Sequence, residues 1–203
     1  MNSNQYTIYI IDDDEAVRDS LCMLVDSVGL ACRSFASAQD FLHSYQDSFT
    51  GCLITDVRMP GLSGLQLQEI LREREIPLPI IFLTGNGDIP MAVKAIKAGA
   101  IDFMSKPFRD QELLDCIQKA LIEFSKIQNQ LITKNSITTR LSTLTIREKD
   151  ILRSVVDGKS NKNIADEFNL SQRTVEAHRA NVMKKMQTHS VAELVKLVSS
   201  LEY

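Results

Sequence analysis

Short apolar runs and amphipathic segments alternate along the first 124 residues of the chain. Runs of this length, bounded by polar or turn-forming residues, are typical of strands that are buried on both faces of a parallel sheet. The segments between them repeat apolar residues at the spacing of a helix face, as Val17, Leu21 and Leu24 do. The pattern predicts five strands, over residues 6–11, 30–35, 51–54, 78–83 and 101–104.

A helix is predicted after each of these strands. Because parallel neighbours must be joined by crossover connections, a strict alternation of strand and helix indicates an α/β doubly wound, flavodoxin-like fold with a five-stranded parallel sheet. Ser37 is expected to cap the second helix. The first helix is predicted to end at Ser27, and the last three cover residues 63–74, 88–98 and 110–124.

The end of the chain has a helical pattern without strands and predicts a small all-α domain. Thr145 and Glu148 have the spacing of a capping box, which starts a helix that ends at Gly158. A tight turn capped by Ser171 separates the next two helices, and this helix-turn-helix arrangement delivers its second helix to the major groove of DNA. These later helices are predicted over residues 161–168, 172–186 and 190–201.

Residues 125–140 are polar and rich in Gln, Asn, Ser and Thr. We expect the fifth helix to run on through Ile127 and Leu131 and then to give way to a looser Thr-Lys-Asn-Ser segment. The chain is therefore predicted to hold two domains, residues 1–124 and 141–203, joined by a partly helical linker.

Charge separates the two parts of the chain. Residues 1–126 carry 11 basic and 18 acidic side chains, a net charge of −7, whereas residues 127–203 carry 12 and 8, a net charge of +4. A basic second half indicates that only this half meets a polyanion.

The rest of the composition indicates in which cellular compartment the protein is expected. No apolar run is long enough to span a membrane, and the first residues lack a signal-peptide pattern, so we expect a cytoplasmic protein without membrane contact. The cysteines have no CxxC spacing and are expected to be small buried side chains in a reducing compartment. They are Cys22, Cys32, Cys52 and Cys116.

Polar side chains stand at the ends of four of the predicted strands. In open α/β sheets, ligands bind in the crevice beyond the carboxyl ends of the strands, so these side chains are expected to converge there. Taken singly, an aspartate at such a place more often caps the next helix and a lysine is more often a solvated charge. Together they favour a functional site. The set consists of Asp12, Asp13, Asp56, Thr84 and Lys106.

This combination predicts phosphoryl chemistry. Three crowded carboxylates repel one another unless a cation joins them, and oxygen ligands suit Mg²⁺. An aspartate beside Mg²⁺ and a lysine can attack phosphorus to form an aspartyl phosphate. Lys106 and Mg²⁺ would neutralise the transferring oxygens, and the Thr84 hydroxyl would donate a hydrogen bond to one of them.

The segments IIDDDE, LITDVRMPGLSG, IIFLTGNGD and AIDFMSKPF carry these residues. They resemble the receiver domain of bacterial response regulators, which has a CheY-like fold. The resemblance implies that Asp56 is the phospho-acceptor. It also implies that Asp13, Asp56 and the main-chain carbonyl of Arg58 bind Mg²⁺, with Asp12 assisting through water.

The same resemblance pairs Thr84 with Phe103 as a coupled switch. Tyrosine is frequent at the aromatic position, so Phe103 lacks a hydroxyl that could hydrogen-bond in the active state, and a plain core role is the alternative. The Lys106–Pro107 peptide bond is expected to be cis.

Residues 172–186 have the geometry of a recognition helix. Val175, Val182 and Met186 share one face, and two alanines in the middle of the opposite face let the backbone sit deep in a groove. His178 lies beside the apolar face and is expected to pack there. A solvated polar face is the plain alternative, but the positive charge of this part favours DNA. The expected DNA contacts are Arg173, Thr174, Glu176, Arg179, Lys184 and Lys185.

The segments LTIREKDIL, SNKNIA and LSQRTVEAHRANVMKKM resemble the LuxR-type helix-turn-helix, and the whole chain is similar to FixJ-like response regulators. The resemblance implies a transcriptional regulator in which a sensor histidine kinase phosphorylates Asp56 and so switches dimerisation and sequence-specific binding to double-stranded DNA. RNA polymerase is a further candidate partner. No kinase nucleotide motif occurs, so the only expected catalysis is Mg²⁺-dependent self-phosphorylation from a donor and self-dephosphorylation.

Two other functions have to be compared with this one. An aspartate-nucleophile phosphohydrolase would carry a second acid two residues after the nucleophile, where this chain has Arg58. A phosphorylation-independent DNA-binding regulator would keep only a vestigial pocket, and the complete set of pocket residues argues against it.

In related regulators, the surface of the fourth helix, fifth strand and fifth helix pairs two receivers about a two-fold axis. We expect the same here, with Lys97 and Asp102 pairing across the axis. Such a homodimer would bind a two-fold-symmetric DNA site, because it tethers two DNA-binding domains. The surface is predicted to include Met91, Lys94, Lys97 and Asp102.

Overall fold

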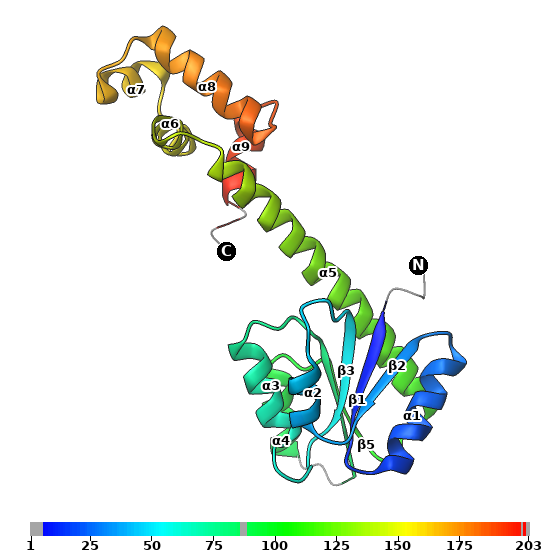
Figure 1. Ribbon diagram of the computed structural model, residues 1–203. Coiled ribbons are helices and arrows are strands. Elements are labelled where there is room, and N and C mark those ends of the chain that lie inside the picture. Colours follow the sequence, from blue (N-terminus) through cyan, green and yellow to red (C-terminus); the bar gives the residue numbers. More distant parts are fainter. Residues whose placement is uncertain (1–5, 86–88, 200, 202–203) are drawn as a thin grey trace. The chain divides into compact units, whose positions relative to one another are not determined.

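A computed structural model describes residues 6–85, 89–199 and 201 of the chain. The chain divides into two compact units, Met1–Gln128 and Asn129–Tyr203. In the first unit, strands and helices alternate as the hydrophobic pattern predicts (Figure 1). No helix within the described parts of the chain combines the length and apolar character that crossing a membrane requires.

The first unit is built on one parallel sheet with the strand order β2-β1-β3-β4-β5. This is the order of flavodoxin-like folds, in which the winding reverses between β1 and β3, and the predicted fold class is confirmed. The fourth strand begins two residues later than predicted because Pro79 has no N–H to donate to the ladder. The strands are β1 (Thr7–Ile11), β2 (Ala31–Phe35), β3 (Gly51–Asp56), β4 (Ile80–Thr84) and β5 (Asp102–Ser105).

Helices cover both faces of this sheet. Side chains that alternate along β1 point to opposite faces: Ile8 and Ile10 pack with α1 and α5, whereas Tyr9 and Ile11 pack with α2 and α3. Ser37 caps α2 as predicted. The predicted start of the fourth helix, Asp88, lies outside the described residues. The helices are α1 (Glu15–Ser27), α2 (Ala38–Ser44), α3 (Gly64–Glu73), α4 (Ile89–Lys97) and α5 (Asp110–Ser142).

The fifth helix is much longer than predicted. The prediction of a looser segment after Leu131 is wrong, because α5 continues without a break to Ser142. Its last turns belong to the second unit, where Ile137 is buried in the core and Leu141 packs against it. Contacts of this kind stabilise a helix that its polar composition alone would leave marginal.

The second unit is helical throughout its described part. Thr145 and Glu148 form the predicted capping box at the start of α6, and Ser171 caps α8. The left-handed conformation of Asn169 ends α7 and makes the tight turn into α8. The helices are α6 (Ile146–Val156), α7 (Asn161–Phe168), α8 (Gln172–Met186) and α9 (Val191–Ser199).

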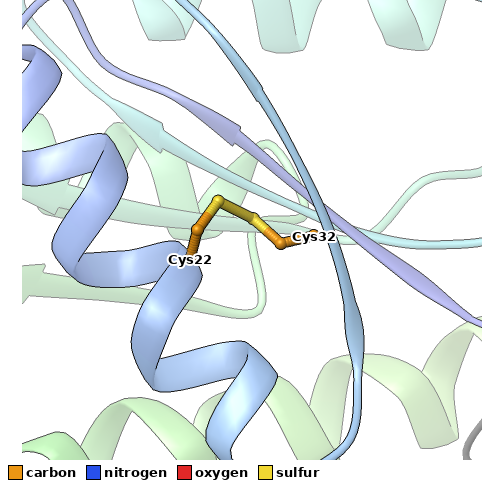
Figure 2. The surroundings of a disulfide bond; sticks show 2 residues. All are labelled: Cys22 and Cys32. Atoms are coloured by element: carbon orange, nitrogen blue, oxygen red, sulfur yellow. A yellow bond between two sulfur atoms is a disulfide. The ribbon is translucent and has the colours of Figure 1, made fainter.

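The prediction that the cysteines are small buried side chains in a reducing compartment is wrong for Cys22 and Cys32. Cys22 of α1 and Cys32 of β2 form a disulfide (Figure 2). Helix and adjacent strand bring their Cα atoms to 5.5 Å, a separation that allows the bond and that spacing along the chain does not reveal. Cys52 and Cys116 are free and buried, as predicted.

Candidate functional site

The carboxyl edge of the sheet brings together residues from distant parts of the chain. Asp12 follows β1, Asp56 ends β3, and Lys106 follows β5. The Lys106 Nζ atom lies 2.5 Å from Asp12 Oδ2 and 3.2 Å from Asp56 Oδ2. One ammonium group therefore bridges two carboxylates, which is the convergence that the strand ends predict.

The main chain and the carboxylate of Asp12 are both held by neighbouring elements. The residue is 2% exposed, and its Oδ1 atom accepts a hydrogen bond from the Asp14 N–H at 3.0 Å. Its carbonyl oxygen accepts from Arg18 Nη1 at 2.8 Å, and its N–H donates to the Phe35 carbonyl oxygen at 3.3 Å. Asp12 is thus fixed from both α1 and β2.

Asp56 is positioned by the backbone around it. Its Oδ1 atom accepts a hydrogen bond from the Arg58 N–H at 3.0 Å, and its side chain is 14% exposed. A Cβ atom on Gly64 would lie 2.2 Å from the Asp56 carbonyl oxygen, so only glycine allows α3 to begin this close to the strand end. The carboxylate of Asp56 is therefore ordered yet open to a small donor.

Charge at this edge favours the protonated lysine. Burial lowers the pKa of the Lys106 ammonium, but the hydrogen bond and charge of Asp12, followed by those of Asp56, outweigh it and raise the pKa above its ordinary value. An attacking carboxylate and the incoming phosphoryl oxygens would therefore meet a fixed positive charge.

The predicted magnesium ligands are only partly gathered. Asp12 and Asp56 share Lys106, whereas Asp13 is exposed, and the described residues include no group of three or more His, Cys, Asp or Glu side chains that could hold a metal ion. Mg²⁺ keeps several waters and needs only one or two carboxylates, so the donor set at this edge fits it chemically. The metal assignment stays a prediction.

The predicted switch residues lie on the two neighbouring strands. Thr84 ends β4 and is 1% exposed, and its carbonyl oxygen accepts from the Lys106 N–H at 2.7 Å. Phe103 on β5 is half-buried, with its ring centroid 6.2 Å from that of Phe82. The Lys106–Pro107 peptide bond is cis, as expected.

Helix α8 in the second unit has the two faces that the sequence predicts. Val175, Val182 and Met186 are buried, whereas Ala177 and Ala180 are exposed. His178 and Thr174 are half-buried between these faces. Among the predicted DNA contacts, the exposed side chains are Arg173, Glu176 and Lys184, and the half-buried ones are Thr174, Arg179 and Lys185.

Several of these side chains are held by partners that the sequence did not indicate. Arg179 Nη1 donates to Asn161 Oδ1 at 2.7 Å, and Asn161 Nδ2 lies 3.5 Å from Glu176 Oε1. Asn161 begins α7, so it links the two helices of the helix-turn-helix. Asn161 lies within the SNKNIA segment, but no spacing rule predicts which helix it contacts.

Lys185 also has an intramolecular partner. Its Nζ atom lies 2.6 Å from Glu148 Oε2 and 3.2 Å from the Thr143 carbonyl oxygen. Lys185 therefore joins the end of α8 to the start of α6, and its contact with DNA stays a prediction.

The predicted dimer surface includes exposed side chains of α4 beyond the four predicted residues. Lys94 and Lys97 are exposed on α4, and Met91 is half-buried. The carboxylate of Asp102 accepts hydrogen bonds from the Phe103 N–H at 2.8 Å and the Cys116 thiol at 3.1 Å. Three further α4 side chains form an exposed apolar stripe: Ile89 (81%), Val93 (45%) and Ile96 (46%).

Comparison with known proteins identifies both units. Residues 8–118 match the response regulator receiver domain, and residues 142–198 match the bacterial regulatory proteins of the luxR family. The chain is 44% identical to the transcriptional regulatory protein FixJ of Bradyrhizobium diazoefficiens, over 94% of this chain and 93% of FixJ. It is 45% identical to the response regulator protein TodT of Pseudomonas putida, over 100% of this chain and 89% of TodT.

Solved structures agree with these matches. The response regulator StyR has a TM-score of 0.85 at 41% identity, covering 98% of this chain and 100% of StyR. The chain belongs to the family of two-component response regulators that combine a receiver domain with a LuxR-type DNA-binding domain. Within that family, its identity to FixJ and TodT over nearly the whole chain groups it with the FixJ-like and TodT-like transcriptional regulators.

Proposed function

We propose that Asp56 accepts a phosphoryl group from a partner histidine kinase and that this modification controls dimerisation and DNA binding. The observation that carries the proposal is the bridge that Lys106 makes between Asp12 and Asp56 at the carboxyl edge of the sheet. It combines a nucleophile, a fixed positive charge and a second carboxylate at a place where this fold binds ligands.

The proposed step transfers one phosphoryl group. An oxygen of the Asp56 carboxylate attacks phosphorus, a new O–P bond forms, and the bond from phosphorus to the kinase histidine breaks. Mg²⁺, held by Asp13, Asp56 and the Arg58 carbonyl with Asp12 through water, would supply positive charge to the phosphoryl oxygens. Lys106 supplies the protein's own charge, since its ammonium already lies within 3.2 Å of Asp56.

The acyl phosphate gives the protein a signal to transmit. A phosphoryl group adds negative charge and acceptor oxygens, which attract the Lys106 ammonium and the Thr84 hydroxyl. Thr84 ends β4 and its carbonyl oxygen is bonded to the Lys106 N–H, so movement at one strand end reaches the other. Helix α4 follows β4 in the chain, so movement at the end of β4 changes the surface that α4 exposes.

The exposed stripe of Ile89, Val93 and Ile96 supports a receiver homodimer through α4. These residues recur at a helical spacing, and a second copy about a two-fold axis would cover them. Lys94 and Lys97 lie beside the stripe and would fix the register in which the two copies pair. The dimer would hold two DNA-binding units at a two-fold-symmetric site, where the cytoplasmic regulator would engage RNA polymerase.

The nucleophile is tested with Asp56→Asn, which keeps the shape of the side chain and removes its reactivity. With acetyl phosphate and Mg²⁺, the wild-type protein should gain one acid-stable, base-labile phosphoryl group by mass spectrometry, and the variant none. Asp40→Asn, at an exposed carboxylate in α2, is the matched control and should label normally. Equal labelling of Asp56→Asn would remove Asp56 from the mechanism.

The labelling assay, together with a DNA-binding measurement under the same conditions, separates the two alternatives. A phosphohydrolase would release phosphate from the donor rapidly and retain little label, whereas a regulator would hydrolyse its phosphoryl group slowly and retain close to one group per chain. A phosphorylation-independent regulator would bind DNA equally well with and without the donor. The proposed function predicts single labelling followed by tighter DNA binding.

A further inference from the structure

The disulfide between Cys22 and Cys32 joins α1 to β2 (Figure 2). Both residues are half-buried, so part of each remains open to solvent. The strand β2 lies at the edge of the sheet, and β1 is its only partner among the residues that the structure describes. A covalent bond at this place restrains a strand that has hydrogen-bonded support from one side alone.

The other two cysteines are poorly suited to the same chemistry. Burial raises the pKa of the Cys52 thiol to about 12. Burial, followed by the hydrogen bond to Asp102, raises the pKa of the Cys116 thiol to about 11. Because the thiolate is the reactive form, disulfide exchange at neutral pH is directed to Cys22 and Cys32.

The elements that the disulfide joins are also the ones that hold Asp12. The Arg18 guanidinium in α1 donates to the Asp12 carbonyl oxygen at 2.8 Å, and the Phe35 carbonyl oxygen in β2 accepts from the Asp12 N–H at 3.3 Å. The peptide groups on either side of Asp12 are therefore fixed by one partner in each element. Because the Cys22–Cys32 disulfide joins α1 to β2, its formation restrains Arg18 and Phe35 together.

We propose that Cys22 and Cys32 are a reversible redox modification site, closed by low-molecular-weight disulfides and opened by thiols, that stabilises the receiver unit around Asp12. In closure, one cysteine thiolate attacks the small disulfide, whose S–S bond breaks and releases one thiol. The second cysteine thiolate then attacks the mixed disulfide and releases the second thiol. The cysteines lose two electrons and two protons, and the small disulfide becomes two thiols.

This chemistry matches the setting of a DNA-binding regulator. Disulfides are rare in compartments where DNA and reduced glutathione occur together, and those that form there are usually transient or redox-sensing. The site would therefore be open under reducing conditions and close under oxidative ones. Closure of the site would act on the main chain around Asp12, one of the two carboxylates that Lys106 bridges.

The site is tested on the full chain equilibrated with oxidised or reduced glutathione. After denaturation and treatment with iodoacetamide, the oxidised protein should carry two carbamidomethyl groups and the reduced protein four. Peptide mapping should place the protected pair at Cys22 and Cys32. Four reactive thiols after equilibration with oxidised glutathione would overturn the proposal, as would a linkage through Cys52 or Cys116.

A second measurement tests the stabilising effect without relying on a variant. The melting temperature of the receiver transition should be higher in the oxidised wild type than in the reduced wild type by roughly 5–15 °C. Amide exchange should slow in β2 and over Asp12–Asp14. Cys22→Ser and Cys32→Ser are the controls, and their melting temperatures should not respond to glutathione. Equal melting and exchange of the two wild-type forms would contradict the proposal.

Discussion

The ammonium group of Lys185 in α8 lies 2.6 Å from a carboxylate oxygen of Glu148 in α6. Glu148 is 4% exposed and also closes the capping box with Thr145. The hydrogen bond from Lys185, followed by the backbone hydrogen bond from Thr145, lowers the pKa of the Glu148 carboxyl below its ordinary value. The pair connects α8 to α6 within the second unit.

This pair predicts a pH-dependent contribution to stability. A depressed carboxyl pKa stabilises the folded state fully above the unfolded pKa of about 4.3, and the contribution is lost as pH falls through the folded pKa. Glu148→Gln keeps a capping acceptor and removes the charge. We expect it to lower the free energy of unfolding by about 0.5–1 kcal/mol at pH 7, since Lys185 is partly solvated.

Urea unfolding of the full chain, followed by circular dichroism, measures this contribution at neutral and acidic pH. The difference between Glu148→Gln and wild type should shrink below the ordinary carboxyl pKa of about 4.3. Asp166→Asn, at an exposed carboxylate in α7, is the control and should have little effect at either pH. If Glu148→Gln lowered the free energy of unfolding equally at neutral and acidic pH, the carboxylate charge would not be the cause of the loss.

Arg58 is expected to prolong the life of the acyl phosphate. Its N–H bonds to Asp56, but its side chain is exposed and long enough to shield the phosphorus from water. Arg58→Ala keeps the N–H, so hydrolysis should be faster by roughly 2- to 10-fold, at most 1.4 kcal/mol in the barrier. Decay of the labelled protein after donor removal measures this.

The control for this prediction is Arg58→Lys, which keeps most of the length and should decay at close to the wild-type rate. Unchanged or slower decay of Arg58→Ala would reject shielding. A similar position at the rim of the pocket is expected for Asn86, two residues after Thr84, which lies outside the described residues.

Glu176 is expected to read a base in the major groove. It is exposed on α8, and a carboxylate can accept a hydrogen bond from the amino group of cytosine. Glu176→Ala should change the preference at one base pair by about 1–3 kcal/mol. Asn161→Ala should shift the same preference, because Asn161 contacts both Glu176 and Arg179.

The control is Lys184→Ala, which should weaken binding to all sequences and reduce its salt dependence. Lys184 suits this role better than Lys185, whose removal would also break the pair with Glu148. Binding to a library of site variants distinguishes the two kinds of effect. A uniform loss for Glu176→Ala would mean that Glu176 does not read sequence.

The dimer should depend more on the apolar stripe of α4 than on its charges. Val93→Asp places a charge in the middle of the stripe and should abolish dimerisation in beryllofluoride. Lys97→Ala should change the dissociation constant by no more than about 30-fold, because the two-fold axis repeats the pair with Asp102 twice, each exposed ion pair contributes at most about 1 kcal/mol, and Asp102 is already bonded to Cys116. Sedimentation velocity compares the two variants, and a Val93→Asp protein that still dimerises would exclude this surface.

The elements with strong local signals could be predicted closely from the sequence. Helix α8 has the predicted bounds because Ser171 caps it and its apolar residues keep one helical face. The convergence of Asp12, Asp56 and Lys106 could also be predicted, since parallel strands present their carboxyl ends at one edge.

The features that the sequence missed depend on contacts between distant residues. The continuation of α5 rests on the burial of Ile137, and the Cys22–Cys32 bond rests on the packing of a helix against a strand. The partner of Asn161 likewise becomes visible only when α7 and α8 are placed together. Local propensity and spacing contain no information on such pairs.

The central claim is that phosphorylation of Asp56 controls DNA binding, and one titration tests it most directly. A fragment with a two-fold-symmetric site, selected from genomic DNA by footprinting, is titrated with wild type and Asp56→Asn, each with and without beryllofluoride and Mg²⁺. We predict that beryllofluoride tightens binding by the wild type alone and that sedimentation shows a dimer under the same conditions. Equal affinity of the wild type with and without beryllofluoride would contradict the account.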